Sequence, residues 1–477
     1  MSNSVLPQKD SQQEITSQIR TVQEFLAGGL DPDVFDWQEV WYPVCYIEDL
    51  NKSQATRFTL LEQDIVIWWD QKEQTWRAFI DQCPHRLAPL SEGRINHEGL
   101  LECPYHGWAF SGTGQCERIP QQTQTTKAEV SQRACVATLA TIVRQQMLFV
   151  YPGRAENAAK TKVPIVEPLE QDPDGWIYLN TFRDVPYDAL TLMENVLDTS
   201  HIPYTHHRTV GNRANASPID LEIMESGKWG FKGTWAQGPR KGTLGRQDTT
   251  FIAPGLMWHD LTSKQYGRTL TVVYATPIRK GECRLFAQFP FKFSSKLPGL
   301  FLRVTPRWYS HIGQNRVLED DQIFLHYQER YFEKLGGSAN FTKAFYLPTK
   351  ADLFVSELRS WVKQYKAEPF KSECLPPPLP KEVLLDRYHS HTKKCASCRP
   401  ALTQLQRLRV GVAVVAALIW GFLPLLMLIQ NPISIISVIV LTLVMIFSVL
   451  IWLGLGKLEQ QFYQGGEIPP RNLPEKN

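Results

Sequence analysis

The chain has 477 residues, enough for two or three domains and a sizeable core. Its formal net charge is only +3, and it has no dense run of Lys or Arg, which argues against nucleic-acid binding. Nine cysteines in so long a chain do not form a disulfide scaffold. Four of them lie in C-x-H, C-x-x-H and C-x-x-C patterns, which indicates metal or redox chemistry in a reducing compartment.

Residues 1–36 form a polar extension with a short amphipathic stretch at 19–26. It has no apolar core, unlike a secretory signal, and several acids but few arginines, unlike a transit peptide. Stretches rich in aromatic and β-branched residues then predict a small all-β domain over 37–155. Its predicted strands are 37–46, 55–61, 64–69, 75–81, 108–111, 136–144 and 146–151.

Two pairs of metal-binding residues lie in this first domain. Cys83 and His85 form C-x-H, and Cys103 and His106 form C-x-x-H, with seventeen residues between the pairs. Two thiolates and two imidazoles in two tight pairs suit a [2Fe–2S] cluster of the Rieske type. A Cys₂His₂ zinc site has the same ligands. Zinc fingers, however, usually pair Cys with Cys and His with His, whereas each pair here is mixed.

A larger segment over 160–370 predicts an α+β layer with a pocket between its strands and a long helix. We expect a strand at 176–182, a helix at 186–201 and several alternating strands between 220 and 293. A second helix is expected at 318–335, ending at Gly336 and Gly337.

The end of the first of these helices offers a second metal site. Asn195, Asp198 and His201 recur every three residues and share one helical face, so Asn195 and Asp198 are candidate catalytic residues. Pro203 is expected to break the helix, so that His201 ends it and His206 returns from the turn. Two His and one carboxylate form the facial triad of non-haem Fe(II) oxygenases.

The third ligand of this triad must come from a distant acid. In the helix 318–335, Asp321 lies on the apolar stripe, Asp320 points sideways and Glu319 points away. A buried acid is costly unless it is paired or bound to metal, so we choose Asp321, with Asp320 as the fallback. The remaining histidines are expected to be satisfied or exposed rather than ligands: His97, His207, His259, His311 and His326.

The C-terminal part differs from the rest of the chain in its long uncharged runs. A linker over 371–408 contains C-x-x-C at Cys395 and Cys398, and two uncharged runs follow at 410–429 and 433–456. Each run is long enough to cross a bilayer core of ~30 Å, so we predict two transmembrane helices over 409–457 and a polar tail over 458–477. Two buried core helices are the alternative. Basic residues flank the spans, but the turn has no charge, so both ends are expected on the cytosolic side.

Several motifs together resemble one family. They are WYPV at 41–44, DQCPHRLAPLSEGR at 81–94, CPYHGWAF at 103–110, RIPQ at 118–121, ENVLDTSHIPYTHH at 194–207, and C-x-x-C before two C-terminal spans. Over about 37–457 the chain resembles the pheophorbide a oxygenase-like group of Rieske non-haem iron oxygenases. Because a transit peptide is missing, it looks like a cyanobacterial member.

The resemblance implies a Rieske domain followed by a helix-grip, START-like catalytic domain, usually in a homotrimer. Asp198 would bridge His201 to His106 of a neighbouring subunit. Electrons would come from ferredoxin or a flavin reductase, and O₂ would oxidise a lipophilic ring substrate, a chlorophyll-type tetrapyrrole such as pheophorbide a. The protein would lie in the thylakoid or plasma membrane of a cyanobacterium.

Two other functions stay open at this point. One is hydroxylation or demethylation of a different apolar ring compound, and the other is a membrane-bound redox sensor or electron carrier.

The C-x-x-C pair also has more than one interpretation. The resemblance suggests that Cys395 and Cys398 form a dithiol switch that thioredoxin reduces. The upstream His389 and His391 would instead complete a zinc site. A third interpretation is a plain linker.

Overall fold

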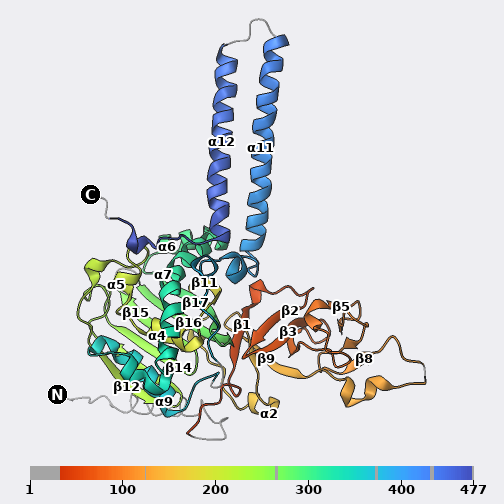
Figure 1. Cartoon of the computed structure of the whole chain (residues 1–477), viewed down its shortest axis with the longest axis vertical. Coiled ribbons are helices and arrows are strands. Elements are labelled where there is room, and N and C mark those ends of the chain that lie inside the picture. The colour runs from red at the N-terminus through yellow and green to blue at the C-terminus, as the bar shows by residue number, and fades with distance from the viewer. Residues whose placement is uncertain (1–32, 124, 264–266, 371–373, 430–434, 475–477) are drawn as a thin grey trace, which may run out of the picture.

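The computed structural model describes residues 33–123, 125–263, 267–370, 374–429 and 435–474. Two globular parts lie side by side, and a long helical hairpin projects from them (Figure 1). The amphipathic stretch predicted at 19–26 and the turn between the apolar runs fall outside the described residues.

The N-terminal part is built on a six-stranded antiparallel sheet of order β1-β10-β9-β4-β3-β2. The predicted strands are present, although the first begins at Tyr42 and not at residue 37. Their aromatic and β-branched side chains fill both faces, and Ile65, Val66, Ile67 and Trp68 are all fully buried. The bounds are β1 (Tyr42–Tyr46), β2 (Thr56–Leu60), β3 (Gln63–Asp70), β4 (Thr75–Ile80), β9 (Thr138–Arg144) and β10 (Met147–Tyr151).

A second, four-stranded sheet of order β5-β6-β7-β8 forms the outer end of this part. The strands are short: β5 (Arg94–Ile95), β6 (Leu101–Glu102), β7 (Ala109–Phe110) and β8 (Cys116–Arg118). One metal-binding pair precedes β5, and the other lies in the loop from β6 to β7. The small sheet therefore fixes both loops at one end of the molecule.

The second globular part contains a seven-stranded antiparallel sheet of order β11-β17-β16-β15-β14-β13-β12. The strands are β11 (Ile177–Val185), β12 (Leu221–Gly227), β13 (Gly230–Trp235), β14 (Gln247–Ile252), β15 (Leu256–Ser263), β16 (Gly267–Arg279) and β17 (Glu282–Lys292). Helices α4 (Ala189–Leu197), α7 (Arg307–Lys334) and α9 (Leu353–Gln364) pack on it. The α+β class and the all-β first part agree with the prediction.

Helix α7 begins eleven residues before the predicted start at 318. The early turns hold the polar residues His311 and Asn315, which are nevertheless buried against other parts of the chain. The apolar period therefore does not reveal them. The other described α-helices before the hairpin are short: α2 (Ala155–Ala158), α3 (Glu167–Gln171), α5 (Ile202–Thr205), α6 (Lys296–Val304), α8 (Phe341–Ala344) and α10 (Lys381–Leu384).

Buried polar contacts join the two globular parts. Arg284 of β17 forms an ion pair with Asp184 and donates a hydrogen bond to the Val44 carbonyl of β1. Thr276 donates to the Pro43 carbonyl at 2.6 Å. Because these groups are buried in a shared core, the two parts have a fixed mutual position.

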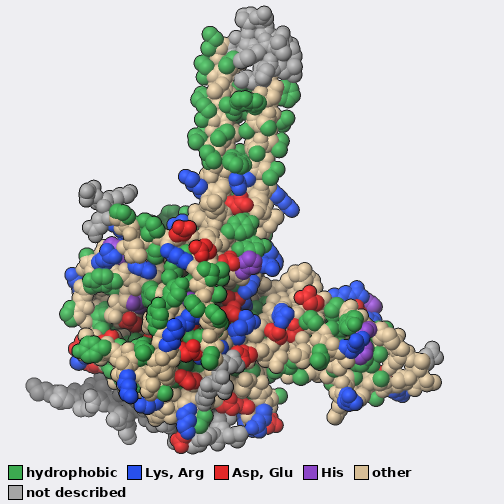
Figure 2. Space-filling model, in the orientation of Figure 1, with side chains coloured by type: hydrophobic (Ala, Val, Ile, Leu, Met, Phe, Trp, Pro, Cys, Tyr) green, Lys and Arg blue, Asp and Glu red, His purple; other side chains and the backbone are tan. Residues whose placement is uncertain are grey.

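The hairpin consists of α11 (Cys398–Ile429) and α12 (Ile435–Tyr463). Both helices are long and apolar enough to cross a membrane, with mean hydropathy 1.5 and 2.9 and only 6% of either span buried. Figure 2 shows hydrophobic side chains over the described surface of the hairpin. The alternative of two core helices predicts burial, but most of the hairpin side chains that the structure describes are exposed.

Candidate metal centres

The two loops of the first site have the same backbone pattern. In the first loop, the Cys83 carbonyl accepts from the Leu87 amide, and the Cys83 amide donates to the Ala88 carbonyl. In the second loop, the Cys103 carbonyl accepts from the Gly107 amide, and the Cys103 amide donates to the Trp108 carbonyl. Leu87 and Gly107 both have positive φ, 58° and 72°, so each loop turns back in the left-handed region at the same place. The loops thus present their Cys and His side chains in matching directions.

The cysteines of this site face inward and the histidines face outward. Cys83 and Cys103 are buried, whereas His85 is exposed and His106 is half-buried. The two imidazole rings lie 4.6 Å apart, and His85 also stacks on Trp108. Hydrogen bonding with Cys83, and then with backbone N–H groups, lowers the pKa of the Cys103 thiol to about 6, which favours a thiolate. This donor set fits a cluster with an inner Cys₂ iron and an outer His₂ iron.

The second site forms where α4 ends. The helix stops at Leu197, four residues earlier than predicted, and a separate one-turn helix, α5, follows. Pro203 lies in the first turn of α5, where its missing N–H costs nothing, so it starts a helix instead of breaking one. His201 and His206 flank α5 and turn toward each other, with their Nε2 atoms 3.2 Å apart.

Asp321 of α7 completes this second cluster. Its carboxylate oxygens lie 3.3 Å from His206 Nε2 and 3.9 Å from His201 Nε2. Ligands about 2.1 Å from a metal at right angles are roughly 3 Å apart, so the three atoms fit one face of a metal ion. Burial raises the pKa of the Asp321 carboxyl, an unfavourable charge that a bound cation would compensate.

Asp320, the fallback ligand, lies behind His206 instead. Its Oδ2 is 3.3 Å from His206 Nδ1 and accepts from Thr209 Oγ1 at 2.7 Å. A carboxylate that accepts from the outer N–H of an imidazole orients the ring toward a metal. The two neighbouring acids thus have different positions, and only Asp321 faces both histidines.

Asn195 and Asp198 lie beside this cluster. Asn195 Nδ2 donates to Asp321 Oδ1 at 3.4 Å. The Asp198 carboxylate accepts from the backbone and hydroxyl of Ser200, and its backbone carbonyl contacts His201 Nδ1. Within one chain, the contact of Asp198 with His201 is therefore made by the backbone, and the carboxylate is half-buried at the edge of the site.

Glu319 does not point away from the protein, as the helical pattern predicted. It is buried, with an ion pair to Arg183 of β11 and two charged hydrogen bonds from Arg387. The prediction was wrong because the C-terminal segment, which supplies Arg387, covers the face of α7 that periodicity assigns to solvent.

A third cluster of metal-binding residues surrounds the C-x-x-C motif. His311, His391, Cys395 and Cys398 are all buried, and one donor atom of each lies within 4.8 Å of the others. His389, the other histidine of the predicted H-x-H, is exposed and contacts Asp386 at 2.6 Å. His311, expected to be a satisfied or exposed histidine, is buried and hydrogen-bonded, and it lies within this cluster. No local spacing marks it, because it is 80 residues from His391 in sequence.

The other histidines have ordinary surroundings. His97 is exposed, and His207 is half-buried and accepts from the Arg213 amide. His259 contacts the Thr249 hydroxyl and the Val196 carbonyl, and His326 contacts the Pro186 carbonyl.

Comparison with known proteins identifies the family. The sequence matches the Rieske [2Fe-2S] domain over residues 40–140 and the pheophorbide a oxygenase family over residues 251–339. It is 38% identical to "Pheophorbide a oxygenase, chloroplastic" of Oryza sativa subsp. japonica over 405 residues, which cover 79% of this chain and 75% of the rice protein. The chain belongs to the pheophorbide a oxygenase family of Rieske non-haem iron oxygenases.

Proteins similar to this chain are named for more than one activity. The chain is 34% identical to "Flavonoid 8-hydroxylase 2, chloroplastic" of Ocimum basilicum, over 80% of this chain and 76% of the basil protein. Its fold resembles crystalline dicamba monooxygenase bound to dicamba, with a TM-score of 0.55 and 21% identity over 69% of this chain and 99% of that one.

Membership of the pheophorbide a oxygenase family makes the chain an oxidoreductase that uses O₂, an electron donor and a hydrophobic substrate. It also implies a [2Fe–2S] cluster and a mononuclear iron, and the first two donor sets fit these groups. The zinc alternative for the first site is wrong, because its residues lie within a Rieske domain.

Proposed function

We propose that the chain is a membrane-anchored Rieske oxygenase that oxygenates a chlorophyll-type tetrapyrrole resembling pheophorbide a. The observation that carries this proposal is the combination, in one chain, of the Rieske residues and the His201, His206 and Asp321 cluster with an apolar hairpin and 38% identity to a pheophorbide a oxygenase. A tetrapyrrole of this type dissolves in lipid, so an enzyme attached to the bilayer reaches it directly.

The charges at the base of the hairpin support the anchor and its orientation. Arg399, Arg407 and Arg409 precede the described apolar part of α11, and Lys457 follows that of α12. Figure 2 shows Lys and Arg side chains at the base of the hairpin. Arg409 also pairs with Glu459 across the two helices. By the positive-inside rule, the globular parts lie on the cytosolic side. We assign the protein to the thylakoid or plasma membrane of a cyanobacterium.

The outward-facing histidines support electron transfer between subunits. Leu87 and Tyr105 are close to them in sequence and are 69% and 57% exposed, so two apolar side chains lie on the surface at the outer end of the cluster site. We propose that this surface docks on a neighbour in a homotrimer, where Asp198 of one subunit meets His106 of the next. Ferredoxin or a flavin reductase would supply the electrons.

The residues around the second site have separate roles in this proposal. His201, His206 and Asp321 would hold the iron, which when bound supplies O₂ activation. Asp320 keeps the proton of His206 on Nδ1, so that Nε2 stays free to bind metal. Asn195 donates to Asp321 and so limits the rotation of that carboxylate.

The basil relative favours a second candidate, hydroxylation of a flavonoid-like ring. Both functions need the same metal centres and differ in the substrate. A redox sensor or electron carrier needs only the first centre, so iron content separates it: about three irons per chain for an oxygenase and two for a carrier.

Product analysis tests the proposal. The full-length protein in detergent, with ferredoxin and its reductase, is incubated under ¹⁸O₂ with pheophorbide a, other chlorophyll-type pigments, a flavone and a sterol. We expect ¹⁸O in the product of a tetrapyrrole alone. Incorporation into the flavone or sterol but no pigment would overturn the substrate assignment.

A further inference from the structure

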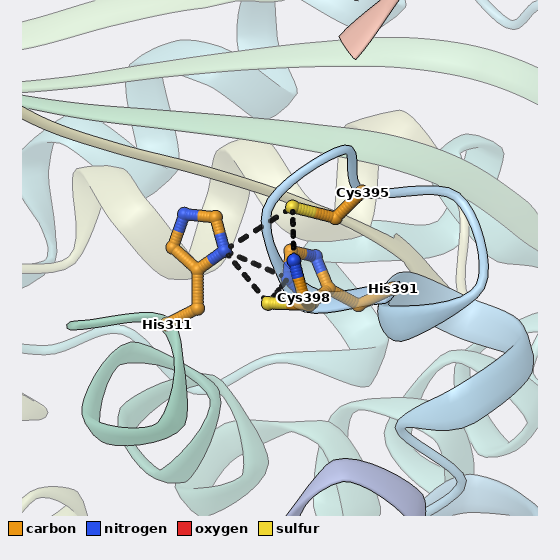
Figure 3. A group of neighbouring side chains, drawn as sticks. All are labelled: His311, His391, Cys395 and Cys398. Atoms are coloured by element: carbon orange, nitrogen blue, oxygen red, sulfur yellow. Dashed lines mark hydrogen bonds between the residues drawn. The ribbon is translucent and has the colours of Figure 1, made fainter. Parts of the chain in front are cut away.

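The cluster at the C-x-x-C motif is a closed, buried set of four donor atoms from three parts of the chain. His311 comes from α7, His391 from a π-helical turn (Tyr388–Thr392), and Cys395 and Cys398 from the start of the hairpin. Figure 3 shows their side chains pointing toward one point. Neither of the two proposed iron centres uses these residues.

The distances match a tetrahedral ion. His311 Nδ1 lies 3.3 Å from Cys398 Sγ and 3.5 Å from Cys395 Sγ, and His391 Nε2 lies 3.3 Å from Cys398 Sγ. The two nitrogens are 2.9 Å apart. With bonds of ~2.3 Å to sulfur and ~2.0 Å to nitrogen, a tetrahedral zinc separates N from S by about 3.5 Å and N from N by about 3.3 Å.

A hydrogen bond at the outer nitrogen of each histidine leaves the inner nitrogen with its lone pair. His311 Nε2–H donates to the Asn180 carbonyl at 2.8 Å, and His391 Nδ1–H donates to the Phe182 carbonyl at 2.6 Å. Carbonyls only accept, so they hold the proton of a neutral imidazole on the outer atom. The inner nitrogens then direct two lone pairs at each other across 2.9 Å. A cation between them removes this repulsion.

We propose that His311, His391, Cys395 and Cys398 bind a structural zinc ion. Two sulfurs and two nitrogens in a tetrahedral set are typical of zinc, and four protein ligands leave no position for substrate or water. The ion is therefore a structural link and takes no part in the oxygenation.

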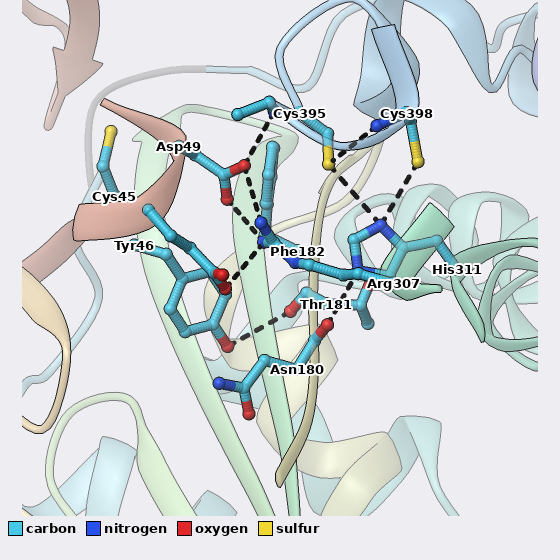
Figure 4. A network of polar contacts seen from close by, with 12 residues as sticks. Cys45, Tyr46, Asp49, Asn180, Thr181, Phe182, Arg307, His311, Cys395 and Cys398 are labelled. Carbon is cyan, nitrogen blue, oxygen red and sulfur yellow. Dashed lines mark hydrogen bonds and ion pairs between the residues drawn. The ribbon is translucent and has the colours of Figure 1, made fainter. Parts of the chain in front are cut away.

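The position of the site explains what the link holds. Asp49 of the first globular part accepts from the Ala396 amide at 2.8 Å and from Arg307 of α7 at 2.7 Å (Figure 4). Cys398 begins α11, and His311 lies ten residues before Asp321 on α7, about 15 Å along the axis. The zinc thus attaches the membrane hairpin to the helix that carries the proposed iron ligand.

A dithiol switch is the competing use of the same cysteines. A thioredoxin must reach a sulfur, but Cys395 is 0% and Cys398 2% exposed. A disulfide would also remove the thiols that could donate to the inner nitrogens of His311 and His391. Both points favour a metal over a switch.

Zinc content and zinc X-ray absorption test the proposal on the full-length protein purified in detergent without chelators. We expect about one zinc per chain besides the iron, with a zinc edge fitted by two sulfurs at ~2.3 Å and two nitrogens at ~2.0 Å. This measurement needs no variant and does not depend on activity.

Matched substitutions locate the ion. His391→Ala and Cys395→Ser should lose the zinc, and the neighbouring His389→Ala and the exposed Cys374→Ser should retain it. All four should keep the visible spectrum of the Rieske cluster, which reports that the first part has folded.

Any one of several results would overturn the proposal. They are less than a tenth of an equivalent of zinc in the wild-type protein, a zinc edge without sulfur ligands, and a Cys395–Cys398 disulfide found by mass spectrometry in freshly purified protein. The last would support the dithiol switch instead. Iron in place of zinc, as about four irons per chain, would also contradict it.

Discussion

Nδ1 of His206 lies 3.3 Å from the buried carboxylate of Asp320. Asp320 and Asp321 are adjacent in sequence but lie at different nitrogens of this ring, because Asp321 faces Nε2. We predict that Asp320→Asn retains a bound mononuclear iron but lowers iron affinity or turnover by about 10–100-fold, as the loss of such a supporting carboxylate does. Iron titration of the apo-protein and steady-state turnover check this.

The matched variant is Asp321→Ala. It should reduce the iron content from about three to about two per chain while the Rieske spectrum is unchanged. If Asp320→Asn loses the iron and Asp321→Ala keeps it, the assignment of the two acids is reversed.

The strands of the first part and the candidate ligands that the structure brings together in two clusters could be predicted from the sequence, because each prediction depends on local patterns. C-x-H and C-x-x-H lie in tight loops, and Asp321 follows from the apolar stripe of one helix. Local patterns do not report what covers a helix from elsewhere. The helical pattern predicted that Glu319 is exposed, but Arg387 of the C-terminal segment pairs with it and covers it.

His311 is the clearest case of a residue that sequence reasoning missed. Its neighbours on α7 give no ligand spacing, and its partners Cys395 and Cys398 lie more than 80 positions away. Only the packing of the hairpin base against α7 brings them together. The sequence also suggested both His389 and His391 as ligands, but the π-helical turn places only His391 beside the cysteines and leaves His389 exposed.

Asp198→Asn tests the proposed electron route. The local fold should survive, because an asparagine oxygen can still accept the Ser200 contacts. We expect both irons to remain and turnover to fall at least 10-fold, since the negative carboxylate between subunits is lost. Ser200→Ala, which keeps the carboxylate, is the control and should retain most of the activity. Wild-type turnover in Asp198→Asn would refute the bridge.

Glu319→Gln tests the buried ion-pair network on α7. Removing the charge leaves the guanidinium groups of Arg183 and Arg387 buried without their partner, which costs about 3–5 kcal/mol of unfolding free energy. Denaturant unfolding in detergent measures this. Asp248→Asn breaks an exposed pair with Arg246 and should cost less than about 1 kcal/mol. Equal effects of the two substitutions would contradict the network.

His259 predicts a pH dependence of stability. Burial lowers the pKa of this imidazole to about 4 from an ordinary value of 6.5. The unfolded chain therefore binds a proton between these values and the native chain does not. Stability falls as the pH drops from 6.5 to 4, by about 3 kcal/mol for this group.

His259→Gln can still form hydrogen bonds with Thr249 and Val196 but does not titrate. Unfolding free energies of the two proteins, measured from pH 7 to 4, should therefore differ in slope over this window. Parallel curves would show that His259 is accessible to protons in the native state.

The most direct test of the central claim is a single turnover. The protein is fully reduced, freed of donor and mixed with ¹⁸O₂ and pheophorbide a, while the spectrum of the Rieske cluster is followed. We predict that the cluster is oxidised together with the appearance of ¹⁸O-labelled product, and that Asp321→Ala gives neither. Oxidation of the cluster at the same rate in wild type and Asp321→Ala, without labelled product, would show that the chain is an electron carrier and not an oxygenase of this pigment.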